Sequence, residues 1–116
     1  MTSKHTHPVL DWQAADFQSW LETLPADQPC GEPWSNRECP LAQWRRAEGD
    51  PVAVTTYLAY QFFSETFAYL PLWATRFVFL VDRDGSRDGP IFPPRALTAL
   101  DAALRDTPMR LVAEEE

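Results

Sequence analysis

Two cysteines and two histidines carry the most reactive side chains in this sequence. Thiolate and imidazole are the ligands that zinc prefers, but eight residues separate Cys30 from Cys39, where zinc sites usually have two to four. Cys39 precedes Pro40, which suits the first turn of a helix, and a helix N-terminus lowers the pKa of a thiol. The histidines, His5 and His7, lie in a polar N-terminal stretch, away from any folded segment in which one of them would act as a base. We therefore interpret both cysteines as buried thiols, with a metal- or thiol-dependent module that uses them as the alternative.

The segment Asp82–Ile91 carries the most site-like polar pattern. From Asp84 it reads D-x-S-x-D-G-x-I, which resembles the first eight positions of an EF-hand calcium loop. The twelfth position, where such a loop has a bidentate glutamate, is Arg95, and a cation there opposes the binding of an ion. We interpret the segment as a polar turn between two helices and assign no metal ligand, while a metal-dependent module at this loop stays the alternative.

No pattern in the sequence points to catalysis. It contains no glycine-rich phosphate loop, no dinucleotide fingerprint and no nucleophile elbow. Asp82 and Asp84 fall in the expected turn, and Asp101 falls on the polar face of a helix, so no carboxylate pair stands in an apolar context. The sequence predicts a protein that is not an enzyme, with no catalytic residue and no cofactor.

Five tryptophans in this short chain need either a core or a partner. Trp20, Trp44 and Trp73 fall on apolar helix faces and are expected in the core. Trp12 is expected to point about 140° away from the apolar face of its helix, and Trp34 lies in a proline-rich loop. Exposed tryptophan is enriched at binding hot spots, so Trp12 and Trp34 are candidate partner-binding residues. The alternative is that loops and helix ends cover them.

Apolar spacing, prolines and β-branched runs predict an α+β fold in the order α-α-β-β-α-α. The expected helices cover 11–24, 40 to the break at Gly49, 71–81, and a segment that starts at Pro93. The expected strands cover 51–60 and 67–70 and form an antiparallel hairpin, and 109–112 suits one further short strand.

The third expected helix is apolar nearly all round. Trp73, Phe77 and Leu80 share the core side, whereas Leu72, Phe79 and Val78 fall elsewhere on the same cylinder. Either other segments wrap this helix, or it leaves an apolar strip larger than monomers usually expose. The second reading predicts a homodimer or a contact with another protein at Leu72 and Phe79.

The length and composition suit a single globular domain. The chain has 116 residues, 45% of them hydrophobic, which suits one domain with its own core. We expect a flexible arm over 1–9, a single globular domain over 10–113 and a frayed acidic tail over 114–116.

The charge of the chain disfavours several classes of partner. The net charge of −7 disfavours direct binding of nucleic acid or of an anionic membrane. The polar N-terminus lacks a secretory signal, so we expect a cytoplasmic location.

By elimination, the sequence predicts a small acidic protein that acts by binding a protein partner. It is expected to work as a regulator, adaptor or inhibitor, including of a basic, nucleic-acid-binding protein, because a surplus of carboxylates complements a basic surface.

Overall fold

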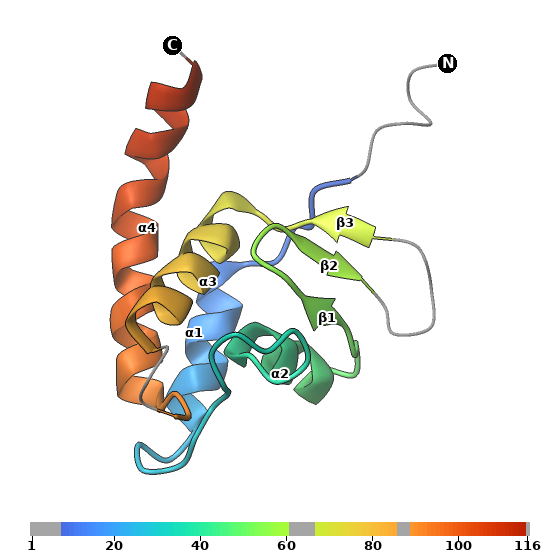
Figure 1. Cartoon of the computed structure of the whole chain (residues 1–116), viewed down its shortest axis with the longest axis vertical. Helices are drawn as coiled ribbons and strands as arrows, with labels where there is room; N and C mark the ends of the chain where they lie inside the picture. The colour runs from blue at the N-terminus through green and yellow to red at the C-terminus, as the bar shows by residue number, and fades with distance from the viewer. Residues whose placement is uncertain (1–7, 61–66, 86–88, 116) are drawn as a thin grey trace.

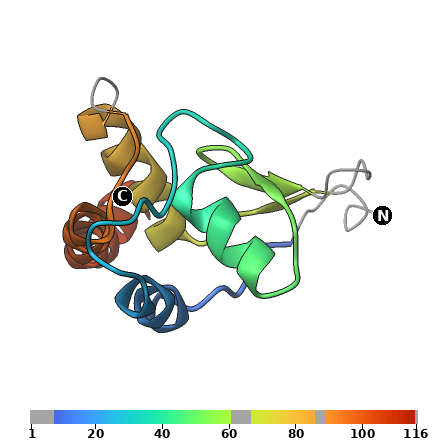
Figure 2. The same ribbon diagram turned by 90° about the horizontal axis from the view of Figure 1, so that it is seen from below.

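The computed structural model describes residues 8–60, 67–85 and 89–115, and it confirms the α+β class (Figure 1). In chain order the elements are α1 (Ala14–Thr23), α2 (Pro40–Ala47), β1 (Ala53–Val54), β2 (Leu58–Tyr60), β3 (Phe67–Tyr69), α3 (Leu72–Gly85) and α4 (Pro93–Glu115). Figure 2 shows α1, α3 and α4 gathered on one side of the molecule, with α2 and the sheet on the other. The core lies between these two groups.

The sheet has three antiparallel strands, in the order β1-β2-β3, where a two-stranded hairpin was predicted. The strand expected over 51–60 is interrupted by a tight turn at Thr55, whose hydroxyl oxygen accepts the backbone N–H groups of Tyr57 at 3.2 Å and Leu58 at 2.9 Å. A side-chain oxygen that satisfies two backbone donors stabilises a turn within a run of residues that otherwise favours a strand. The single-strand prediction for 51–60 is therefore wrong.

The N-terminal segment pairs with the outer edge of this sheet. Val9 forms a parallel bridge with Tyr69. The Leu10 N–H donates to the Tyr69 carbonyl at 2.8 Å, and the Tyr69 N–H donates to the Pro8 carbonyl at 2.8 Å. Pro8 and Val9, which we expected in the flexible arm, thus extend the sheet, while residues 1–7 of that arm lie outside the described residues.

An aromatic cluster fills the core between α1, α2 and α3. Phe17 is fully buried, and its ring centroid lies 5.1 Å from that of Trp44, 5.9 Å from Trp73 and 5.0 Å from Phe77. These short centroid distances are those of interacting aromatic pairs, which contribute beyond their buried area. Trp44, Trp73 and Phe77 are buried, as their helix faces predicted.

Trp12 belongs to the same cluster, contrary to its expected outward direction. Helix α1 begins at Ala14, and Gln13 is extended, so helical geometry does not fix the direction of the Trp12 side chain. The indole packs edge-on against Trp44 at 5.6 Å, and its backbone carbonyl accepts the Trp73 indole N–H at 2.9 Å. With 8% of its surface exposed, Trp12 is a core residue.

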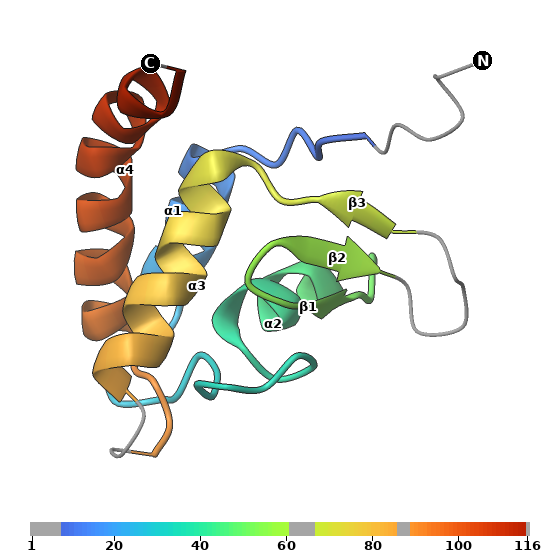
Figure 3. The ribbon, with the colours of Figure 1, turned by 45° about the horizontal axis from the view of Figure 1, so that its top comes forward.

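Helix α3 lies between α4 and the sheet (Figure 3), which explains its apolar circumference. Trp73, Phe77 and Leu80 are buried, as predicted, and Val78 is buried as well because it faces the sheet side. Other elements therefore cover Val78 as well as the predicted core side, whereas Phe79 is exposed and Leu72 half-buried.

Helix α4 runs without a break from Pro93 to Glu115, through the residues for which a strand was expected. The prediction of a strand over 109–112 is wrong, because a lone short strand leaves its backbone groups unpaired whereas a continuing helix satisfies them internally. No helix in the described part of the chain combines the length and the hydropathy needed to cross a bilayer.

Candidate functional site

A close backbone approach at Gly31 positions the loop that carries the candidate site. Gly31 and Ile91 form an antiparallel bridge, with the Ile91 N–H donating to the Gly31 carbonyl at 2.8 Å. A Cβ atom on Gly31 would lie 2.5 Å from the backbone nitrogen of Pro40, at the start of α2. Only glycine fits at this distance. The loop is thereby held between the N-terminus of α2 and the segment that follows α3.

Trp34, three residues further on, is an exposed tryptophan in a strained backbone conformation. Its φ of 61° lies in the left-handed region, which bulky residues rarely adopt. Its backbone N–H donates to Oδ1 of Asp82 on α3 at 2.9 Å, and the Ser35 hydroxyl accepts the Glu38 N–H at 3.0 Å. The loop is therefore fixed by specific bonds, yet 65% of Trp34 stays exposed to solvent.

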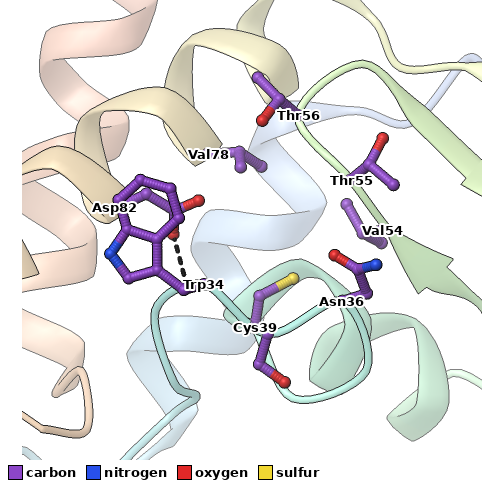
Figure 4. Close-up of a pocket in the computed structure, with 9 residues that line it drawn as sticks. Trp34, Asn36, Cys39, Val54, Thr55, Thr56, Val78 and Asp82 are labelled. Atoms are coloured by element: carbon purple, nitrogen blue, oxygen red, sulfur yellow. Dashed lines mark hydrogen bonds between the residues drawn. The ribbon is translucent and has the colours of Figure 1, made fainter. Parts of the chain in front are cut away.

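Beside Trp34 lies a small pocket of about 140 Å³ (Figure 4). Its walls come from the loop, from β1 with the turn after it, and from α3: Trp34, Ser35, Asn36, Cys39, Val54, Thr55, Thr56, Val78 and Asp82. Sites for cofactors and drug-sized ligands usually measure about 300–1,000 Å³, whereas a cavity of about 150 Å³ holds one benzene ring. The pocket thus has room for a single side chain, not for a nucleotide or a metabolite of similar size.

Asp82 is the one carboxylate among the residues that line this pocket. Burial raises the pKa of Asp82, and the hydrogen bond from the Trp34 N–H partly offsets that rise. Oδ1 accepts this bond, while Oδ2 has no hydrogen bond or ion pair to any residue that the structure describes. A partly desolvated carboxylate with a free oxygen is stabilised in its charged form by an approaching cation.

Both cysteines are buried, as predicted, and their burial opposes thiolate chemistry. Burial raises the pKa of Cys30 to about 12 and that of Cys39 to about 11. The N–H groups of Leu41 and Ala42, at the start of α2, act to lower the Cys39 pKa, but burial outweighs them. The expected lowering at the helix N-terminus is therefore wrong, because desolvation disfavours the charged form more strongly than the helix favours it. At neutral pH both thiols are protonated, the form that is neither nucleophile nor metal ligand.

The calcium-like segment is only partly within the described structure. Residues 86–88 lie outside it, and Asp82 directs one oxygen to the Trp34 N–H. Within the described ranges, no three acidic, cysteine or histidine side chains gather as a metal site would require.

The four predicted partner-binding residues fall into different environments. Trp12 is buried, so its indole is unavailable to a partner, whereas Trp34 is exposed and Leu72 is half-buried. Phe79 is 49% exposed, with the Arg83 guanidinium 5.8 Å from its ring centroid. Phe79 precedes Asp82 by three residues on α3, so the two are neighbours on the helix surface.

We call Trp34, Phe79 and Asp82 the Trp34 surface. Asp82 was missed as part of it because the sequence pattern assigned this residue to a turn, and no spacing signal links it to Trp34, 48 residues earlier. Comparison of this chain with protein-family models, curated proteins and solved structures finds no match.

Proposed function

We propose that this chain is a non-catalytic protein that binds a protein partner through the Trp34 surface. The observation that carries the proposal is the exposure of Trp34 in a loop fixed by hydrogen bonds and a left-handed backbone. Backbone strain of this kind costs about 1–3 kcal/mol and concentrates at functional sites. Tryptophan, which presents a large rigid surface, is among the residues most enriched at binding hot spots.

The neighbourhood of Trp34 supports a protein partner over a small ligand. Phe79 adds a second exposed aromatic ring one helical turn from Asp82, and the adjoining pocket is too small for a metabolite. Interfaces combine aromatic anchors of this kind with a polar rim. These features suit a regulator, adaptor or inhibitor that works by occupying the surface of another protein.

Charge favours a basic partner over a second copy of this chain. The net charge of −7 repels an identical molecule and attracts a basic surface, including that of a nucleic-acid-binding protein. Burial of Val78 narrows the apolar strip on which the homodimer prediction depended to Leu72 and Phe79. Two free, buried thiols suit a reducing compartment, so we also propose a cytoplasmic location for the protein.

The test compares Trp34→Ala with Tyr69→Ala. Tyr69 is the control because it is an exposed aromatic residue on β3, a strand that contributes no residue to the pocket beside Trp34. Tagged wild-type and variant proteins are purified from the cells of origin, and bound proteins are quantified by mass spectrometry. We expect one partner to remain with the wild type and with Tyr69→Ala, and to fall about 30-fold with Trp34→Ala, which corresponds to about 2 kcal/mol. Equal retention by the two variants would contradict the proposal.

A further inference from the structure

We propose that the pocket beside Trp34 receives the guanidinium group of an arginine side chain from the partner. This inference rests on the proposed function and names the chemical group that the same surface recognises. The argument depends on the size, charge and donor–acceptor character of the pocket.

The size of the pocket selects one side-chain head group. The pocket is an open hollow of about 140 Å³ between the loop, the turn at Thr55–Thr56 and α3. A cavity of about 150 Å³ accommodates benzene, whose planar outline is close to that of a guanidinium with its last methylenes. Trp34, which is exposed, is one of the lining residues, so a group in the pocket lies close to this residue.

The charge of the pocket selects a cation. Asp82 is its only carboxylate, and neither arginine nor lysine is among its lining residues. Oδ1 of Asp82 accepts the Trp34 N–H, and Oδ2 has no partner among the residues that the structure describes. Hydrogen bonds between a guanidinium and a carboxylate are about twice as strong as those between neutral groups.

The remaining lining groups suit a donor-rich ligand with an apolar stem. Asn36 and Thr56 bring side-chain oxygens, and Val54 and Val78 bring methyl groups (Figure 4), while the Thr55 hydroxyl is engaged in its own turn. Guanidinium has five N–H donors and no acceptor, and it stacks on aromatic faces more readily than an ammonium does. An indole beside a carboxylate therefore favours arginine over lysine.

The experiment is a nuclear magnetic resonance titration of the full chain with three probes. N-acetyl-arginine amide carries the proposed group, N-acetyl-citrulline amide has the same shape without the charge, and N-acetyl-lysine amide carries the charge without the planar fork. We expect the arginine probe to shift the signals of Trp34 and Asp82 and to saturate with a dissociation constant on the order of 1 mM, as expected for a ligand of this size. The citrulline probe should give no saturable shift, and the lysine probe should bind at least several-fold more weakly.

The matched variant is Asp82→Asn, which keeps an oxygen for the Trp34 N–H and removes the charge. We expect this variant to keep the wild-type spectrum away from the pocket and to lose arginine binding at least tenfold. An equal response to citrulline or to lysine, unchanged binding by Asp82→Asn, or shifts that lie outside the pocket would each overturn the inference.

Failure of this inference is distinguishable from failure of the proposed function. A partner that needs Trp34 but binds Asp82→Asn as tightly as the wild type leaves protein binding intact and removes the arginine pocket. A saturable arginine response, with no partner that depends on Trp34, leaves the pocket intact and removes the proposed function.

Discussion

Replacement of Gly31 by alanine tests how the fold positions the Trp34 loop. The added Cβ would lie 2.5 Å from the Pro40 nitrogen, 2.7 Å from Pro40 Cδ and 2.8 Å from the Cys39 carbonyl carbon. These distances fall short of ordinary van der Waals contact by about 0.6–0.9 Å. Two of the three atoms are backbone atoms and the third belongs to a rigid ring, so the loop or the start of α2 has to move.

Overpacking of this kind lowers the free energy of unfolding by about 1–3 kcal/mol. We expect the upper half of that range because none of the contacted atoms belongs to a flexible side chain that could move aside. For a domain of this length, 1 kcal/mol lowers the Tm by about 4–5 °C, so Gly31→Ala should lower it by about 8–15 °C. Thermal unfolding followed by circular dichroism measures the shift. The control is Gly49→Ala, where nothing lies within 4 Å of the added Cβ and only the φ of +86° opposes the substitution. That strain alone costs about 1–2 kcal/mol. A Tm for Gly31→Ala equal to or above that of Gly49→Ala would refute the close approach.

Three further predictions concern the core, the thiols and Asp82. Phe17→Ala should lower the free energy of unfolding by about 3–5 kcal/mol, because Phe17 is fully buried among aromatic rings. A domain has a total free energy of unfolding of roughly 5–15 kcal/mol, so the loss is large. An unchanged urea midpoint would show that α1 is misplaced. Cys30 and Cys39 should react slowly with a thiol reagent at pH 8 and quickly once guanidinium unfolds the chain, because burial raises their pKa values to about 12 and about 11; fast labelling of the native protein would contradict this burial. Since the folded-state pKa of Asp82 lies above its ordinary value of 3.8, its ionisation destabilises the fold as pH rises through the folded-state value. Asp82→Asn should therefore be more stable than the wild type at neutral pH and equally stable below the ordinary pKa, and a lower Tm at neutral pH would oppose this account.

Much of the fold could be predicted because local rules and tertiary packing agree there. Pro40 and Pro93 start helices α2 and α4, and the apolar repeat of α3 places Trp73 and Phe77 in the core. The errors arise where one local interaction decides the outcome. The Thr55 hydroxyl ends a strand that its neighbours would continue.

The candidate site was only partly predictable, because long-range contacts build it. Trp34 stood out as a large aromatic residue within a run of prolines, where no helix or strand would cover it. Its partner Asp82 is 48 residues away and meets it only after the loop is anchored at Gly31. Trp12 was misread because its direction depends on where α1 begins, and helix boundaries are set by backbone contacts that the apolar repeat does not encode.

The central claim is that a protein partner docks on the Trp34 surface, and site-specific photo-crosslinking in the cells of origin tests it most directly. A benzoylphenylalanine at position 79 replaces one exposed aromatic ring with another, and the same residue at position 69, on β3, is the control. We predict a discrete adduct with one protein from position 79, its loss when Trp34→Ala is added, and no such adduct from position 69. An adduct from position 79 that persists in Trp34→Ala, or the same adduct from position 69, would contradict the claim.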